Sequence, residues 1–242
     1  MSTTLFHNAI LVNEGESVRG WILVEGDKIA RIGHGDTPAD LQGNADTVTD
    51  CEGAYIIPGV IDTHVHFRDP GLTEKADIAT ESRAAVAGGV TSFIDMPNTN
   101  PATVTADALR GKIVRASQVS VANYGFFLGA TNSNLPELLN ADYTGTAGIK
   151  LFLGSSTGNM LVDDDTTLDA IFSRPRALIA VHAEDEAMIR AARTRLEEEY
   201  PDGIPVEMHP DVRPREACIA ATRHAIALAE RHGSRVHICH IS

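Results

Sequence analysis

Residues 59–66 read Gly-Val-Ile-Asp-Thr-His-Val-His, an apolar strand that ends in two histidines one residue apart. Side chains two positions apart on a strand point to the same face, so His64 and His66 can reach one metal ion. A single histidine in such a place would more often be structural. Barrels of parallel strands and helices keep their active sites at the carboxyl ends of the strands. The stretch therefore predicts a metal-binding strand end in an α/β barrel.

The rest of the chain repeats this pattern of an apolar strand followed by helical sequence. After a first run at residues 56–66, further apolar runs lie at residues 90–96, 119–130, 148–153, 177–183 and 235–241. Helical sequence is predicted between them at residues 73–87, 107–117, 135–139, 168–173 and 184–232. This alternation is typical of a parallel sheet covered by helices. We predict an α/β fold, a (β/α)8 TIM-type barrel that is incomplete, with about six of its eight strands present.

The first 55 residues differ from this pattern and predict a separate small β unit. Strand-like runs occupy residues 5–12, 21–25 and 28–32, and Gly-Asp at residues 26–27 predicts a hairpin turn between the last two. We expect a β-sandwich-like unit at residues 1–55, as half of a composite small β domain. The partial barrel would then occupy residues 56–242.

The composition argues against several classes of function. Acidic residues outnumber basic ones by 33 to 20, and the formal net charge of −13 would repel a nucleic-acid backbone. No run approaches the roughly 18 to 20 apolar residues that a membrane span needs, and residues 1–8 do not resemble a signal peptide. Three widely spaced cysteines predict neither a disulfide framework nor a thiolate zinc site. We expect a cytoplasmic protein without a nucleic-acid or membrane partner.

Two later histidines end strands of the same series. His182 follows the apolar residues Ile-Ala-Val, and His240 ends the last apolar run. Each would be an ordinary histidine if considered alone. Together with His64 and His66 they place four imidazoles on one rim of the barrel, which is a zinc-type ligand set that suits two divalent ions.

Alternation along the last strand sorts its residues between two faces. Val236, Ile238 and His240 are expected on the barrel side, with the candidate ligand His240 at the strand end. His237 and Cys239 are expected to point toward the surrounding helices. We therefore leave these two residues out of the predicted site.

A lysine lies inside the fourth apolar run, Gly-Ile-Lys150-Leu-Phe-Leu. Burying an ammonium group is costly, so burial at this position favours the neutral amine. A neutral lysine amine can add carbon dioxide and become a carbamate, whose two oxygens can bridge two metal ions. The alternative is a lysine at the strand edge that extends its amine to solvent.

These residues resemble the amidohydrolase superfamily over essentially the whole chain. The resemblance rests, in chain order, on residues 58–66, Lys150, His182 and His240. Within the superfamily the sequence is most similar to the N-terminal part of the dihydroorotases. His-Val-His-Phe-Arg-Asp-Pro-Gly at residues 64–71 and Asp-Met-Pro-Asn-Thr at residues 95–99 are close to the signatures of that family.

The resemblance implies a centre with two zinc ions. It implies that His64 and His66 hold one zinc, that His182 and His240 hold the other, and that carboxylated Lys150 bridges them. The sequence around this lysine is similar to the dihydroorotases that use a carboxylated lysine and not to those that use an aspartate.

The resemblance also implies a small-molecule substrate, dihydroorotate, which is hydrolysed reversibly to carbamoyl aspartate in pyrimidine biosynthesis. His66, Arg68 and Asn98 would contact it, because an arginine at a strand end can clamp a carboxylate through two parallel hydrogen bonds and an amide can add a third. An arginine after a strand is more often simply solvated.

The resemblance further predicts parts that would lie beyond Ser242. In the family an aspartate at the end of the eighth strand ligates a zinc and moves the proton, and a C-terminal segment completes the small β domain. The isolated chain is therefore expected to lack the catalytic aspartate. Relatives are commonly dimers, so we expect a homodimer at full length.

Three alternatives stay open at this point. The first is another cyclic-amide hydrolase, such as a hydantoinase, dihydropyrimidinase or allantoinase, which would share the metals but need no arginine clamp of this form. The second is a non-catalytic, dihydroorotase-like scaffold, although such proteins usually lose metal ligands. The third is a truncated product that folds poorly.

Overall fold

The computed structural model describes residues 1–154, 159–173 and 177–241. Its contacts divide the chain into two compact units, Met1–Gly59 and Val60–Ser242. Ile56, which we expected as the first residue of the barrel, forms the short strand β5 (Tyr55–Ile56) together with Tyr55, and this strand pairs with the first strand of the chain. The observed division consequently falls a few residues after the expected one.

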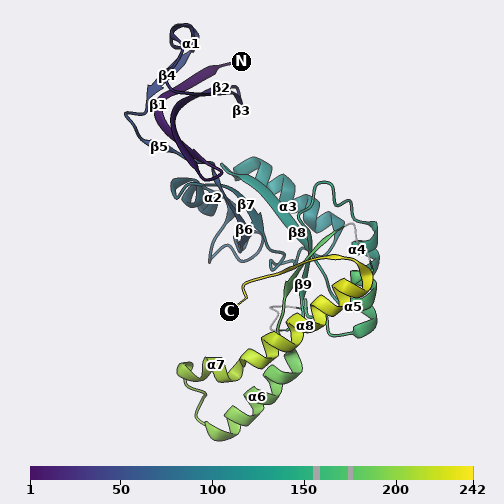
Figure 1. The fold of residues 1–242 in the computed structure, drawn as a ribbon. Coiled ribbons are helices and arrows are strands. Elements are labelled where there is room, and N and C mark those ends of the chain that lie inside the picture. Colours follow the sequence, from purple (N-terminus) through teal and green to yellow (C-terminus); the bar gives the residue numbers. More distant parts are fainter. Residues whose placement is uncertain (155–158, 174–176, 242) are drawn as a thin grey trace. The chain divides into compact units, whose positions relative to one another are not determined.

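The first unit is a five-stranded sheet (Figure 1). Its other elements are β1 (Thr3–Asn13), β2 (Glu16–Glu25), β3 (Lys28–His34), α1 (Ala39–Asn44) and β4 (Thr47–Asp50). The order is β3-β2-β1-β4, and β5 also pairs with β1. Both predicted hairpin strands are present, and Gly26 adopts the positive φ of 61° that their turn requires. Leu5, Trp21 and Leu23 form the small core of this unit.

The second unit contains, among its described residues, six parallel strands that follow one another in chain order across a curled sheet (Figure 1). They are β6 (Val60–Val65), β7 (Val90–Asp95), β8 (Asn123–Gly129), β9 (Gly148–Phe152), β10 (Leu178–His182) and β11 (Arg235–Ile238). Because the strands are parallel, all of their carboxyl ends meet at one edge. The predicted α/β fold with a partial barrel is confirmed.

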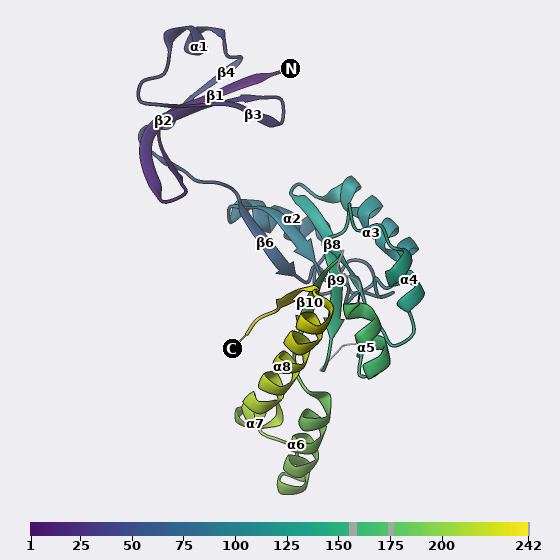
Figure 2. The ribbon, with the colours of Figure 1, turned by 45° about the vertical axis from the view of Figure 1, so that its right-hand side comes forward.

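Helices follow the strands and cover one face of the sheet, as Figure 2 shows for α3, α4 and α5. They are α2 (Ile78–Ala87), α3 (Ala106–Val119), α4 (Leu135–Asn140), α5 (Asp165–Phe172), α6 (Glu186–Glu199), α7 (His209–Val212) and α8 (Arg215–His232). Several begin at a side chain that caps the first turn; Asp77, for example, accepts the Thr80 backbone N–H at 2.7 Å. In the described part of the chain, none of these helices has the length and apolar character to cross a bilayer.

The predicted helical stretch 184–232 is several elements instead of one. Prolines at positions 201, 205, 210 and 214 fall between α6 and α8, and proline cannot donate the hydrogen bond that continues a helix. Residues 200–214 therefore form a connection that contains a 3-10 turn, Val206–Met208, and the short α7. This connection brings Arg213 back toward β10.

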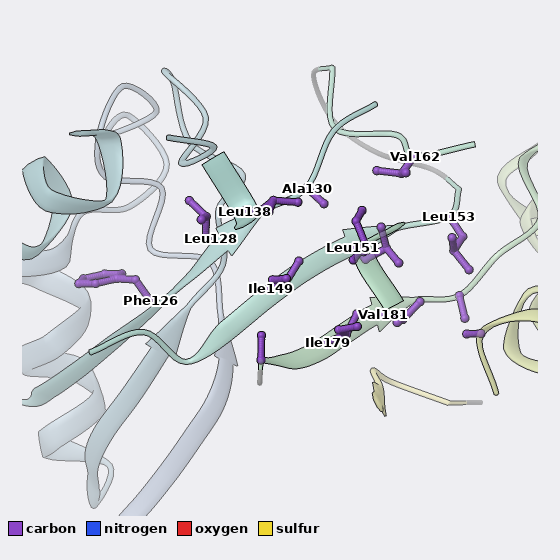
Figure 3. Close-up of a cluster of buried hydrophobic side chains, with 14 of the residues drawn as sticks. Phe126, Leu128, Ala130, Leu138, Ile149, Leu151, Leu153, Val162, Ile179 and Val181 are labelled. Atoms are coloured by element: carbon purple, nitrogen blue, oxygen red, sulfur yellow. The ribbon is translucent and has the colours of Figure 1, made fainter. Parts of the chain in front are cut away.

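Alternate residues of the central strands divide into two layers. The layer toward the helices is the main hydrophobic core and includes Phe126, Leu128, Ile149, Leu151, Ile179 and Val181 (Figure 3). The opposite face of the sheet carries a smaller cluster, formed by Met96, Phe127, Ala180 and Cys239. Lys150 lies between Ile149 and Leu151 and points to this second face, where the candidate site is found.

Candidate functional site

Two of the predicted histidines lie at the carboxyl end of β6. Val65, the last residue of this strand, packs against the main core, so His64 and His66 on either side of it point to the opposite face. Their ring centroids are 5.4 Å apart, and both residues are half-buried. The Asp62 carboxylate accepts the His64 backbone N–H at 3.0 Å and so orders the strand end.

The other two predicted histidines meet each other at the ends of the last two strands. His182 is the final residue of β10, and His240 follows β11 by two residues. His182 Nδ1 and His240 Nε2 lie 3.1 Å apart. The His240 ring centroid is also 5.3 Å from that of His64. The structure thus brings the four predicted histidines together, while their role as metal ligands stays a prediction.

The predicted faces of the last strand are wrong, although His240 does belong to the cluster. Val236 and Ile238 pack against the main core on the helix side, whereas Cys239 is buried on the opposite face. β11 ends at Ile238, and His240 adopts a positive φ of 36°. This local break in the strand interrupts the alternation, so His240 faces the site next to His182.

Lys150 is buried inside the sheet and is 1% exposed. The alternative in which its amine extends to solvent is therefore wrong. Burial lowers the pKa of the Lys150 amine. Its Nζ donates a hydrogen bond to the Cys239 Sγ at 3.2 Å and lies 4.9 Å from the centroid of the Phe152 ring. A buried amine with a lowered pKa is the state from which a carbamate can form.

Arg68 lies close to the histidine cluster. It follows the end of β6, and its backbone is in the left-handed region with a φ of 63°. Burial lowers the pKa of His66, and the positive charge of Arg68 is the next largest cause of that shift. The positive charge of Arg68 therefore acts on the His66 imidazole.

The loops that carry Arg68 and Asn98 pack against each other. Asn98 is buried in the loop that follows β7. In this loop the Asn100 backbone N–H donates to the Pro70 carbonyl at 3.0 Å. Gly71 has a φ of 82°, and a Cβ at this position would overlap the Asn100 carbonyl oxygen. The loop that follows β6 and the loop that follows β7 are therefore packed directly against each other at the strand ends.

A buried ion pair under these loops escaped the sequence analysis. Lys112 Nζ lies 2.7 Å from Asp95 Oδ2, and both side chains are fully buried. The same amine donates to the Met96 carbonyl at 2.8 Å, while Asp95 Oδ1 accepts the Phe67 backbone N–H at 2.9 Å. One ion pair thus joins the ends of β6 and β7 to α3. The helical spacing of Lys112 with its apolar neighbour Leu109 is the signal that could have revealed it.

A second charged pair that the sequence analysis missed contacts His182 directly. Glu184 Oε2 lies 2.5 Å from His182 Nε2. Arg213 donates to Glu184 from Nε at 2.9 Å, and its Nη2 pairs with the other carboxylate oxygen. Arg213 Nη2 is also 3.3 Å from His182 Nε2. No sequence pattern linked these residues, because Glu184 and Arg213 are 29 positions apart.

The four imidazoles are held in the form that binds metals. Burial is the largest cause that lowers the pKa of each of them, to about 4 for His64 and His66 and in the same direction for His182 and His240. All four are consequently neutral at neutral pH. A histidine must be neutral to donate its ring lone pair to a metal ion.

The arrangement fits a pair of divalent ions if Lys150 is a carbamate. The described residues contain no group of three or more His, Cys, Asp or Glu side chains spaced for one metal ion. A carbamate on Lys150 would add the ligand that such a group lacks. Two nitrogens about 2.0–2.1 Å from one tetrahedral zinc lie about 3.3 Å apart. The 3.1 Å between His182 Nδ1 and His240 Nε2 is close to that separation.

Comparison with known proteins identifies the relatives of this chain. The model of the family described as "Amidohydrolase family" matches residues 55–241. A dihydroorotase of Methanosarcina acetivorans is 36% identical over 225 residues, which cover 91% of this chain and 46% of that protein. An allantoinase of Bacillus velezensis is 35% identical over 238 residues, which cover 96% of this chain and 50% of that protein.

Solved structures of related enzymes have the same fold. The L-hydantoinase (dihydropyrimidinase) of Arthrobacter aurescens superposes with a TM-score of 0.90 at 28% identity, over 100% of this chain and 53% of that one. A dihydropyrimidinase of Brevibacillus agri gives a TM-score of 0.81 at 27% identity, over 99% of this chain and 52% of that one. The chain spans about half the length of the relatives that it matches.

Proposed function

Because this chain belongs to the amidohydrolase family, we propose that it forms the metal-binding half of a hydrolase that opens cyclic amides. The observation that supports this most directly is the cluster of four neutral imidazoles beside the buried Lys150. The four histidines lie at the carboxyl ends of parallel strands, where barrel enzymes carry out their chemistry.

In this proposal, His64 and His66 hold one zinc ion, and His182 and His240 hold a second. The neutral Lys150 amine would attack the carbon of carbon dioxide, so that the N–C bond forms as one C=O π bond breaks. The nitrogen's proton would pass to solvent, and an anionic carbamate would remain on Lys150, able to serve as a ligand to both ions. When bound, the two zinc ions supply a hydroxide at neutral pH and polarise the amide carbonyl. The buried surroundings of Lys150 favour this chemistry, since burial lowers the pKa of its amine and so shifts it toward the neutral form.

We propose dihydroorotate as the substrate and carbamoyl aspartate as the product, in the reversible reaction of de novo pyrimidine synthesis. Arg68 would hold the substrate carboxylate through two parallel hydrogen bonds, with Asn98 donating a third from the adjoining loop and His66 beside the ring. The effect of the Arg68 charge on His66 and the packing between the two loops support this assignment. The similarity to proteins named dihydroorotase supports it as well.

A second candidate is a hydantoinase, dihydropyrimidinase or allantoinase. It is favoured by the structural likeness to hydantoinases and by the allantoinases among the relatives. Hydantoin, dihydrouracil and allantoin have no carboxylate, so an arginine clamp would contribute nothing to their binding. Arg68 is therefore the residue that separates the two candidates.

Calorimetric titration of the zinc-loaded and bicarbonate-treated protein with all four compounds tests this choice, and turnover of each is measured in parallel. We expect dihydroorotate to bind most tightly. Substitution Arg68→Gln should weaken its binding about tenfold or more, because hydrogen bonds to charged groups contribute about 1.5–3 kcal/mol. Arg83→Gln, on the exposed face of α2, serves as the control. Tighter binding of an uncharged compound, unaffected by Arg68→Gln, would favour the second candidate.

A further inference from the structure

The two ring nitrogens of His182 have different partners. Nε2 lies 2.5 Å from a carboxylate oxygen of Glu184 and, at the longer distance of 3.3 Å, from Arg213 Nη2, whereas Nδ1 faces His240 Nε2 at 3.1 Å. The shorter contact, to the carboxylate, is the one that decides which partner Nε2 serves. A carboxylate accepts a hydrogen bond but cannot donate one, and a neutral imidazole carries a single N–H. The hydrogen of His182 consequently belongs on Nε2, and the lone pair of Nδ1 points toward His240.

Arg213 fixes the position of the Glu184 carboxylate. It engages both carboxylate oxygens, through Nε at 2.9 Å and through Nη2, in the two-pronged geometry that only a guanidinium offers. The Glu184 and Arg213 side chains are only 16% and 30% exposed, so water competes weakly for this pair. The next residue of the chain is tied as well, since the Asp185 backbone N–H donates to the Ala217 carbonyl at 3.1 Å.

We propose that Glu184, held by Arg213, is the positioning residue that sets the tautomer and ring orientation of His182 and so presents Nδ1 to the metal. This inference rests on the metal centre proposed above and adds two residues to it. Carboxylates that accept the second N–H of a metal-bound histidine fix the ring and strengthen the ligand. The connection between α6 and α8 then has a function, because it delivers Arg213 to the strand end.

The first test needs no metal. Long-range proton–nitrogen NMR spectra of the chelator-treated chain report which nitrogen of His182 carries the hydrogen. We expect the Nε2–H tautomer in the unmodified chain and a mixture of tautomers in Glu184→Ala. An Nδ1–H tautomer in the unmodified chain, or no change in the Glu184→Ala variant, would overturn the inference whether or not the protein binds zinc.

The second test measures zinc affinity by competition with a chromophoric chelator. Glu184→Ala should weaken zinc binding about 10- to 100-fold. Arg213→Met should weaken it in the same direction, and Arg213→Lys should restore part of the loss because the charge returns without the two-pronged geometry. Arg190→Ala is the matched control, since this exposed arginine pairs with Glu186 at 3.9 Å on the same stretch of chain.

The outcomes separate this inference from the proposed function. Should Glu184→Ala fail to unfold cooperatively, Arg213→Met and Arg213→Lys provide the same comparison. Zinc binding that stays unchanged in folded Glu184 and Arg213 variants overturns the positioning role and leaves the metal centre intact. If the unmodified chain binds no zinc, the proposed metal centre is overturned. The tautomer of His182, measured by NMR, then shows by itself whether Glu184 positions this histidine.

Discussion

At the scale of single residues, the buried Lys150 is expected to destabilise the metal-free fold, while the proposed function gives it a role as a metal ligand. Replacing it with methionine keeps a flexible side chain of similar size but removes a polar group whose burial is unfavourable. We expect Lys150→Met to leave the metal-free chain at least as stable in urea unfolding. Its zinc content after loading, measured by elemental analysis, should fall from two ions per chain to one or none.

Lys28→Met is the control for this substitution, because the Lys28 side chain is exposed in the first unit. It should change neither stability nor zinc content. Two tightly held zinc ions in Lys150→Met would contradict the bridging role of the lysine.

The pH dependence of the metal-free fold follows from His64 and His66. Their pKa values are lowered from 6.5 to about 4, chiefly by burial. Between these values the unfolded chain binds protons that the folded chain does not, so the free energy of unfolding should fall as the pH decreases from 6.5 to about 4. Well above pH 6.5 these histidines are neutral in both states, and they contribute no slope.

Urea unfolding of the chelator-treated protein at several pH values across this window measures the effect. The double variant His64→Asn/His66→Asn should show a flatter profile than the unmodified chain. Equal slopes in the two proteins would show that other groups cause the loss of stability.

The sequence predicted which four histidines lie close together, but it did not predict all of the local structure that brings them there. Alternation along a regular strand was enough for His64 and for the inward direction of Lys150. It failed for Val236, Ile238 and Cys239, whose faces are the reverse of those expected. His240 reaches the site because the strand ends at Ile238 and its own φ is positive. Glu184 and Arg213 could not be predicted, since only tertiary structure brings together residues so far apart in the chain.

At the scale of elements, the Lys112–Asp95 pair joins α3 to the ends of two neighbouring strands. Removing one partner of a buried pair leaves an uncompensated charge, which typically costs 3–5 kcal/mol. We expect Lys112→Met to lower the free energy of unfolding by about this amount. The double variant Lys112→Met/Asp95→Asn should recover part of the loss, because the unpaired charge is gone.

Denaturant unfolding of both variants tests this prediction, with Arg110→Met as the control. Arg110 pairs with Asp107 on the exposed side of the same helix, and exposed pairs contribute about 0–1 kcal/mol. Equal stabilities of Lys112→Met and Arg110→Met would show that the buried pair does not hold these elements together.

The order of the helices and strands was easier to predict than the residues at which each one begins and ends. All six apolar runs became strands of one sheet, because apolar strands and amphipathic helices in alternation have few other ways to bury their faces. The prediction for residues 184–232 ignored four prolines and so merged α6, α7 and α8. Within that connection, Arg213 pairs with Glu184 after β10. The spacing of apolar residues in the sequence could not predict this contact.

At the scale of the whole molecule, the two compact units have separate cores. Trp21 is the single tryptophan of the chain and lies in the core of the first unit, whereas α2 to α8 all belong to the second. Tryptophan fluorescence therefore reports the unfolding of the first unit, and the helical circular dichroism signal reports mainly the second. We expect the two signals to change at different denaturant concentrations.

Core truncations should move these transitions one at a time. Leu5→Ala in the first unit should lower the free energy of unfolding obtained from the fluorescence transition by about 2–5 kcal/mol. Ile179→Ala in the second unit should lower the value obtained from the dichroism transition by a similar amount. Coincident transitions that both variants shift together would show that the units unfold as one.

The break in β11 at His240 has a consequence for protein engineering. A designer who grafted this histidine cluster onto an idealised barrel, with every strand extended to the rim, would direct His240 into the layer beneath the helices. A successful graft has to reproduce the left-handed residue as well as the histidine. A template for this centre is therefore a set of backbone torsions in addition to a set of side chains.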